Sequence, residues 1–138
     1  AAALACRALA FAEGSAGAYA VEGACLVSQE GMLFIYAVDE DSFDSPMKGF
    51  RESRLRVGPA EAEAGKAHFS FRLPAGRYGL RCFLDLNGNG RLDRGLLGPA
   101  EPWGMSWREE RRDRLPRFGD IAFAVDRDIR GLVIEVRR

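Results

Sequence analysis

One stretch of the chain combines oxygen-bearing side chains and glycines at the spacing of a metal-binding loop. Residues 85–93 read Asp-Leu-Asn-Gly-Asn-Gly-Arg-Leu-Asp, which is the pattern D-x-N-x-N-G-x-x-D. In calcium loops of the EF-hand type, oxygen ligands come from positions 1, 3, 5, 7 and 9, and glycine at position 6 lets the chain turn around the ion. The spacing therefore predicts that this loop binds calcium.

The candidate calcium ligands are Asp85, Asn87, Asn89, Arg91, Asp93 and Glu101. Arg91 would offer its backbone carbonyl, and Glu101 is the nearest further carboxylate for an ion that takes about six to eight oxygen ligands. Leu96 stands at position 12, where an EF-hand has a bidentate glutamate, so we expect a calcium loop on a different scaffold. With few carboxylates beside two neutral amides, the affinity should be modest and suited to roughly millimolar extracellular calcium.

The same residues have a second interpretation as a tight turn. Asparagine and glycine tolerate a positive φ, and asparagine side chains hydrogen-bond their own backbone. A turn would account for Asn87–Gly90 but not for the aspartates at both ends of the segment. Both interpretations remain open from the sequence.

His68 is the single histidine of the chain, which limits the enzyme chemistry available. A multi-histidine metal site is excluded, and any Ser-His-Asp or Cys-His machinery would depend on this residue. His68 lies next to Phe69 in a strand-like segment, away from any recognisable serine or cysteine motif, so we expect a strand-edge residue. No phosphate-binding glycine loop with its lysine, no C-x-x-C pair and no G-x-S-x-G elbow is present. The sequence therefore predicts a protein that is not an enzyme.

Three cysteines, Cys6, Cys25 and Cys82, leave two if the first belongs to a removed leader. Cys25 and Cys82 are 57 residues apart on strand-like segments and could bridge two sheets of an exported domain. The alternative is a pair of buried free thiols.

Two aromatic residues, Trp103 and Trp107, stand among glycine, proline and methionine. Exposed rings would form a platform for a sugar, peptide or other small ligand, and buried rings would form a flap that closes one end of the fold. We expect the flap, because aromatic residues serve more often in packing. The run 107–117 that follows holds five arginines against three acidic residues, too mixed for a nucleic-acid arm, and should be a solvated surface.

The elements that must position these residues are strands. Apolar residues alternate with polar ones in 69–73 and 78–85, and Met32–Val38 is apolar throughout, as in a central strand. Residues 19–27 form a weaker candidate. At the carboxyl end, 121–125 and 132–136 alternate again, and the link 126–130 has the length of a hairpin connection.

Helical patterns are short, with at most a turn or two at 61–66 and 107–114. About six or seven strands with turn-rich links predict an all-β fold, a Greek-key β-sandwich of about seven strands. The segments 39–56 and 87–118 are long for connections, and such loops are usually functional or disordered. The second carries the candidate site.

Composition describes one soluble globular domain. The chain has 138 residues, of which 47% are hydrophobic and 29% charged, with 20 basic residues against 20 acidic ones. A net charge of zero gives no long-range field to attract nucleic acid or an anionic membrane, and no apolar run reaches the roughly 18–20 residues of a membrane span. We expect the domain to cover residues 20–138. Residues 1–19 would be a signal-peptide remnant or a disordered leader. The alternatives are a lipoprotein cleavage box at residues 3–6 and a frayed alanine-rich helix.

Four motifs in order resemble a known bacterial family. They are P-x-G-x-Y at 74–78, D-x-N-x-N-G-x-L-D at 85–93, E-P-W-G-M-S at 101–106 and R-F-G-D-I-A-F at 117–123. Together they resemble the family known as domain of unknown function 2141, over roughly residues 20–138. The resemblance implies an exported bacterial protein with a transthyretin-like or immunoglobulin-like sandwich, and it implies no reaction.

These observations predict a non-enzymatic, exported β-sandwich, periplasmic or extracellular, whose calcium loop orders a long surface loop in a structural or adhesive role. Its partners would be calcium and a cell-surface or small-molecule ligand, with no nucleic acid. The alternative is a module for small ligands or carbohydrates that uses Trp103–Trp107.

Overall fold

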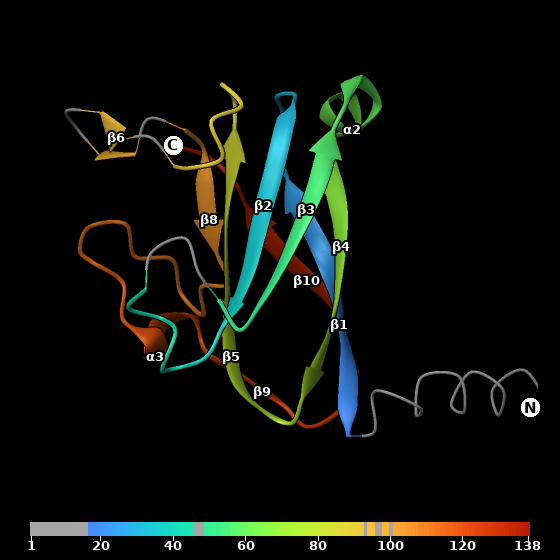
Figure 1. Cartoon of the computed structure of the whole chain (residues 1–138), viewed down its shortest axis with the longest axis vertical. Coiled ribbons are helices and arrows are strands. Elements are labelled where there is room, and N and C mark those ends of the chain that lie inside the picture. Colours follow the sequence, from blue (N-terminus) through green and yellow to red (C-terminus); the bar gives the residue numbers. More distant parts are fainter. Residues whose placement is uncertain (1–16, 46–48, 93, 96–97, 100) are drawn as a thin grey trace, which may run out of the picture.

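The structure is a computed structural model that describes residues 17–45, 49–92, 94–95, 98–99 and 101–138. Two main β-sheets pack against each other and enclose the core (Figure 1). Most of the predicted leader, including Cys6, lies outside the described residues. The all-β sandwich predicted from strand periodicity is confirmed, with eight strands in the two main sheets.

The first sheet has three strands in the order β10 (Ile129–Glu135), β1 (Ala18–Leu26) and β4 (Lys66–Pro74). β1 runs antiparallel to β4 along its whole length and parallel to β10. Cys25, for example, pairs with Ala67 on one side and Ile134 on the other. The sheet therefore joins the first and last strands of the domain.

The second sheet has the order β3 (Arg51–Val57), β2 (Gly31–Val38), β5 (Gly76–Asp85) and β8 (Trp103–Met105). β9 (Phe123–Val125) pairs with the first residues of β5. Neighbours in this sheet are antiparallel. β5 thus occupies the centre, and its last residue is the first residue of the candidate loop.

The remaining elements are short. α2 (Pro59–Ala64) connects β3 to β4, and α3 (Phe118–Ile121) precedes β9. β6 (Arg94–Gly95) and β7 (Gly98–Pro99) pair with each other in a small separate sheet. Among the described residues, no helix is long and apolar enough to cross a membrane.

The core between the sheets follows the period-two pattern of the strands. Phe69, Phe71 and Leu73 of β4 are buried, as their alternation predicts, and face Leu33 and Leu80 of the other sheet within one cluster. A fully buried leucine contributes about 1.5–3 kcal/mol relative to an exposed one. Burial of these alternating positions therefore fixes which face of each strand points inward.

A second apolar cluster covers the outer face of the five-stranded sheet. Phe34, Tyr36 and Phe83 point outward from β2 and β5 and pack with Phe118 and Ile121 of α3. The rings of Phe34 and Phe83 stack with centroids 5.0 Å apart. β2 is consequently buried on both faces, which explains its uninterrupted apolar sequence.

The predicted hairpin between 121–125 and 132–136 is wrong. β9 pairs with β5 in one sheet, whereas β10 pairs with β1 in the other. Asp128 in the link accepts a hydrogen bond from the Ala20 N–H at 2.9 Å. This bond holds the link, where the chain passes from one sheet to the other, against β1. A short link can join sheets as readily as neighbouring strands, because its length fixes only how far apart its ends lie.

Two smaller expectations also need correction. Residues 107–114 form no helix, and Ile121 ends α3 instead of beginning a strand. The predicted long connection 39–56 contains most of β3, an edge strand whose arginines and glutamate hide the alternation. Charged residues are a common way to protect a strand edge from pairing with other chains. The short helix expected at 61–66 is confirmed as α2.

Candidate functional site

The candidate loop begins where the central strand β5 ends. Asp85 pairs in register with Met32 near the start of β2 and is only 3% exposed. A side-chain carbon added to Gly31 would lie 2.6 Å from the Asp85 carbonyl oxygen, so the two chains approach closely here. The loop after β5 stands at the upper end of the sandwich (Figure 1). A buried carboxylate is thus held at the exit of a rigid strand.

The loop folds around the carboxylate of Asp85. The Gly88 N–H donates to Oδ1 at 3.0 Å and the Gly90 N–H donates to Oδ2 at 2.8 Å. Both glycines have φ near the left-handed region, at 76° and 77°, which glycine adopts without strain. A carboxylate offers about four lone-pair sites, and these two donors occupy two of them.

The two asparagines stabilise the rest of the turn through their side chains. Asn87 Oδ1 accepts from the Asn89 N–H at 3.2 Å, and Asn89 Oδ1 accepts from the Arg91 N–H at 3.0 Å. Each bond is the local side-chain-to-backbone contact that the turn interpretation predicts. The same contacts also fix the positions of amide oxygens that a calcium loop would use. The geometry is therefore compatible with both interpretations.

Glu101 follows the loop in the sequence and reaches back to it. Its side chain is 4% exposed, and Oε2 accepts a hydrogen bond from the Leu86 N–H at 2.6 Å. Two buried carboxylates, Asp85 and Glu101, consequently lie at the base of one loop. A charge taken out of water is costly unless it is paired or well hydrogen-bonded. Within the described part of the chain, no ion pair involves Asp85.

The structure brings five of the predicted ligands into one hydrogen-bonded unit. Four of them belong to residues 85–91, and Glu101 holds the second residue of the loop. Asp93 lies outside the described residues. Among the residues that are described, no group of three or more His, Cys, Asp or Glu side chains could hold a metal. Of the five described candidates, Asp85 and Glu101 offer carboxylates, and the remaining three offer amide or backbone carbonyl oxygens.

A groove of about 600 Å³ lies between this loop and the edge strand β3. Its far wall includes Arg54 and Arg56, and Met32 and Phe34 contribute apolar surface. The Arg54 guanidinium lies 5.0 Å from the Phe34 ring centroid and forms an ion pair with Glu52 at 2.7 Å. The groove therefore has two arginines in the wall opposite an oxygen-rich loop.

Residues 101–106 connect the loop to the body of the domain. The Pro102 carbonyl accepts from the Leu84 N–H at 2.9 Å. Gly104 passes so close to β10 that an added Cβ would lie 2.3 Å from the Glu135 carbonyl oxygen. Only a residue without a side chain fits this crossing, and the sequence contained no local signal for it.

Ser106 performs a joining role that the sequence analysis missed. Its hydroxyl accepts from the Leu80 N–H at 2.8 Å and donates to the Ile121 carbonyl at 2.8 Å. Its own N–H donates to the Leu80 carbonyl. One side chain therefore links β5, the end of β8 and α3.

The tryptophans of this region are packed. Trp103 and Trp107 are partly buried against the second apolar cluster, with ring centroids 6.3 Å apart in an edge-to-face arrangement. Packing is what the flap interpretation predicted. The rings cover the outer face of the five-stranded sheet, however, and not one end of the sandwich. A sequence can indicate that an aromatic residue packs, but not which surface receives it.

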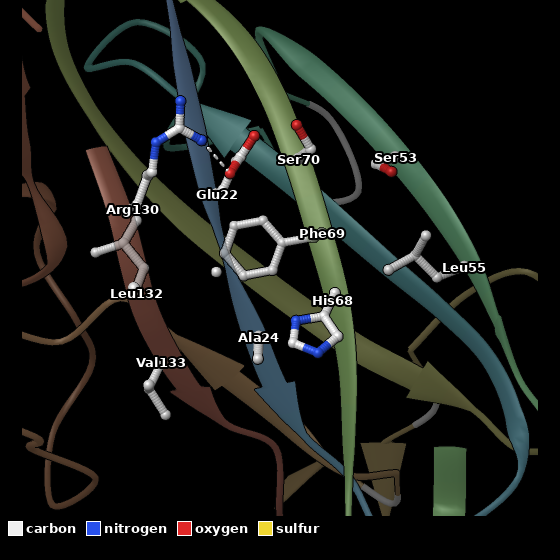
Figure 2. A pocket seen from close by; sticks show the side chains of 12 residues that line it. Glu22, Ala24, Ser53, Leu55, His68, Phe69, Ser70, Arg130, Leu132 and Val133 are labelled. Atoms are coloured by element: carbon white, nitrogen blue, oxygen red, sulfur yellow. Dashed lines mark hydrogen bonds and ion pairs between the residues drawn. The ribbon is translucent and has the colours of Figure 1, made fainter. Parts of the chain in front are cut away.

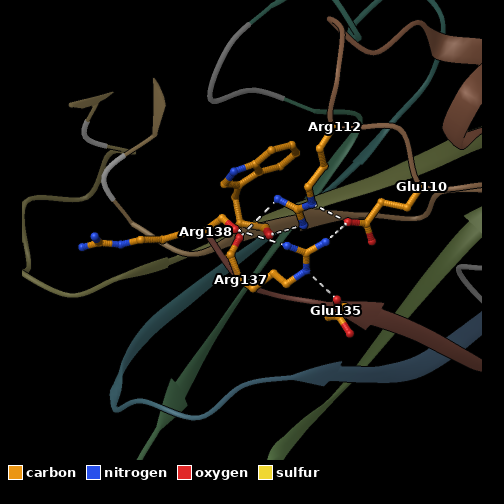
Figure 3. Close-up of polar contacts among 6 residues, drawn as sticks. Glu110, Arg112, Glu135, Arg137 and Arg138 are labelled. Carbon is orange, nitrogen blue, oxygen red and sulfur yellow. Dashed lines mark hydrogen bonds and ion pairs between the residues drawn. The ribbon is translucent and has the colours of Figure 1, made fainter. Parts of the chain in front are cut away.

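The arginine-rich run is only in part the solvated surface that was predicted. Arg112 lies 4.0 Å above the Trp103 ring, and its side chain is only 15% exposed. It donates to the carbonyls of Trp103 and Arg137, and Glu110 pairs with both arginines (Figure 3). This arrangement covers the seam where Trp103 and Arg137 form a β-bridge between the sheets.

The same run is fastened to α3 by an ion pair. Arg114 donates two hydrogen bonds, each 2.9 Å long, to the carboxylate of Asp120. This guanidinium, together with the Arg117 N–H, lowers the pKa of Asp120 to about 2. The pair holds the arginine-rich run 107–117 against α3.

A second groove, of about 680 Å³, lies against β1, β3, β4 and β10 and includes His68 (Figure 2). His68 is exposed on β4, an edge strand of its sheet, as predicted. Within the described residues, no hydrogen bond joins His68 to Ser70, and the Glu22 carboxylate forms an ion pair with Arg130. The three side chains therefore do not form a hydrogen-bonded nucleophile–base–acid set.

Comparison with known proteins gives a family but no activity. A family model described as an uncharacterized protein conserved in bacteria matches residues 20–130. No curated protein and no solved structure matches the chain significantly. Because the match covers most of the sequence and nearly all of the described sandwich, the chain belongs to the bacterial family called domain of unknown function 2141, DUF2141.

Proposed function

We propose that the loop 85–93 binds calcium and that the domain is a non-enzymatic, exported β-sandwich with a structural or adhesive role. The observation that carries this proposal is the buried carboxylate of Asp85, around which the Gly88 and Gly90 N–H groups converge. Within the described residues, no ion pair offsets its charge. A bound cation would do so, and calcium is the hard cation suited to flexible sets of carboxylate, amide and carbonyl oxygens.

Calcium would act on the surface connection that follows β5. Asp85 belongs to the rigid strand, whereas Glu101 stands at the far end of the connection and already holds the Leu86 N–H. An ion that joins oxygens from both ends of this segment would restrict it. The segment continues into Trp103 and Gly104, which contact β10. Binding would therefore stabilise the seam between the sheets as well as the loop.

The test is thermal unfolding of the whole chain in chelator and then in millimolar calcium, with magnesium as the ion control. At about 100 times Kd, a ligand that binds only the folded state adds roughly 2.7 kcal/mol. For a domain of this size that corresponds to a rise in Tm of roughly 10 °C. Magnesium should give little change, because it requires near-octahedral geometry and gives up its water reluctantly.

Variants assign the effect to the loop. Asp85→Asn and Asp93→Asn should abolish most of the calcium-dependent rise in Tm, whatever they do to the Tm in chelator. Glu63→Gln removes one negative charge from an exposed position on α2 and should keep the full response. A chain that melts at the same temperature in chelator and in calcium would refute calcium binding. A response kept by both aspartate variants would place the ion elsewhere.

The expected affinity and the family resemblance both support the proposal of export. A loop tuned to roughly millimolar calcium would be filled outside the cytoplasm and empty within it. Fractionation of a bacterium that expresses its native full-length precursor should recover this domain in the periplasmic or extracellular fraction. Recovery with cytoplasmic markers alone would refute this part of the proposal.

The alternative, a small-ligand or carbohydrate module, would use Trp103 and Trp107 as a contact surface. Arg112 covers the Trp103 ring and both rings pack on the second cluster, which gives this alternative less support. Acrylamide should therefore quench tryptophan fluorescence weakly. Strong quenching, close to that of free tryptophan, would favour the binding platform over packing.

A further inference from the structure

The two described cysteines meet in the core although they belong to different sheets. Cys25 lies on β1 of the three-stranded sheet and Cys82 on β5 of the five-stranded sheet. Cys25 is fully buried, and Cys82 is 4% exposed. Both belong to the cluster between the sheets, so their side chains point toward each other's sheet.

The two thiols interact across the core. The side chain of Cys25 acts on the Cys82 thiol, and the Cys82 thiol donates a hydrogen bond to the Gly104 carbonyl at 3.6 Å. The contact with Cys25, together with burial, raises the pKa of the Cys82 thiol well above its ordinary value. A disulfide requires two cysteines whose side chains are close and directed toward one another. Cys25 and Cys82 are free, buried thiols directed into the same core from opposite sheets.

We propose that Cys25 and Cys82 form a disulfide that links the two sheets when the domain folds in an oxidising compartment. The bond would join the central strand of one sheet to the central strand of the other. It would close a loop across 57 positions of the chain. In the chain-entropy model, a closure of that length strongly restricts the unfolded state.

The bond would form by exchange with a donor disulfide, either a thiol–disulfide oxidoreductase or oxidised glutathione. The thiolate of one cysteine attacks a sulfur of the donor, forms a mixed disulfide and expels one donor thiolate. The second cysteine attacks the mixed disulfide, which forms the Cys25–Cys82 bond and expels the other donor thiolate. The two protons lost by the cysteines pass to the donor thiols, so the chain loses two electrons and the donor gains them.

Exchange should occur before the core closes. In the folded domain both thiols are buried, and the raised pKa of Cys82 disfavours the thiolate that reacts. The reduced, folded protein should therefore oxidise slowly, whereas the unfolded chain should oxidise during refolding. Once formed, the bond should also resist reduction until the domain unfolds.

The experiment compares refolding of the Cys6→Ala chain with a glutathione redox couple and with a phosphine reductant. Removal of Cys6 leaves only the proposed pair. Oxidative refolding should lower the mass by about 2 Da, leave no thiol that reacts with maleimide in denaturant and yield one peptide linking Cys25 to Cys82. The Tm should rise by roughly 10 °C or more over the reduced form.

In the Cys6→Ala chain, the further substitutions Cys25→Ala and Cys82→Ala should each abolish the redox-dependent change in Tm. The comparison of oxidised with reduced Cys6→Ala chain holds even if either of these variants folds poorly. Two reactive thiols and an unchanged Tm after oxidative refolding would overturn the proposal. The physiological setting rests on the export proposed above, but the chemistry does not. Calcium titration of the oxidised and the reduced form therefore tests calcium binding separately from the disulfide. The disulfide can form in a chain that does not bind calcium, and a chain without the disulfide can bind calcium.

Discussion

Replacing Ser106 with alanine tests how the segment after the candidate loop is joined to the sandwich. The hydroxyl accepts from the Leu80 N–H and donates to the Ile121 carbonyl, both at 2.8 Å. Leu80 and Ile121 are each fully buried, so water cannot easily replace the lost partner. Ser106→Ala keeps the backbone bond from its own N–H to Leu80 and removes only the hydroxyl contacts.

The expected cost follows from these two bonds. A typical hydrogen bond contributes about 1 kcal/mol net, and a buried donor or acceptor left unsatisfied costs about 1–3 kcal/mol. We expect Ser106→Ala to lower the free energy of unfolding by about 2–4 kcal/mol. At roughly 3–5 °C per kcal/mol for a domain of this length, the Tm should fall by roughly 10 °C.

Urea unfolding at constant calcium and redox conditions measures this difference. The m-value should stay unchanged, because the substitution alters little of the surface exposed on unfolding. Ser28→Ala is the matched control. Ser28 is exposed before β2, and its replacement should change the stability by no more than about 0.5 kcal/mol. If Ser106→Ala unfolds at the same urea concentration as Ser28→Ala, the hydroxyl does not join these elements as described.

Two further perturbations test the seam between the sheets at Gly104 and the attachment of the run 107–117 to α3. Gly104→Ala should lower the free energy of unfolding by more than about 2 kcal/mol in urea, because its Cβ would meet the Glu135 carbonyl oxygen at 2.3 Å. Gly119→Ala, where nothing lies within 4 Å, is the control, and equal effects would contradict the close approach. Carboxyl NMR should give Asp120 a pKa of about 2. Because the folded pKa lies below the unfolded value of about 3.9, its stabilisation is present above pH 4 and is lost as the pH falls toward 2. Asp120→Asn should remove that acid-dependent component, and a pKa near 4 would exclude the Arg114 contact.

The periodicity of the strands was sufficient to predict the sandwich. Alternation in β4 and β5 and the apolar run of β2 predicted the buried faces, because side-chain direction in a strand follows the local backbone alone. β3 was not predicted, because charged residues fill the solvent-facing positions of this edge strand and hide its apolar alternation. The sequence also could not predict which strands pair with β9 and β10, because a short link does not determine whether the next strand continues in the same sheet.

The candidate site also has a part that the sequence predicted and a part that depends on the tertiary structure. The spacing of residues 85–93 predicted a calcium loop, with a tight turn as the alternative. The hydrogen bonds of Asp85, Asn87 and Asn89 are local and are compatible with both. Glu101 was placed near the loop on grounds of sequence distance. Its burial and its bond to Leu86 depend on how β8 packs beside β5.

The sequence by itself determined the buried faces of β2, β4 and β5 and the spacing of oxygen-bearing side chains in residues 85–91, because each depends on residues that are neighbours in the chain. The order of four motifs along the chain indicated the bacterial family. Only the tertiary structure decided that Cys25 meets Cys82, that Ser106 joins β5 to α3, and that Arg112 covers Trp103. Those contacts join residues from different strands and loops. Their energies arise from burial and hydrogen bonding that exist only after the two sheets have packed together.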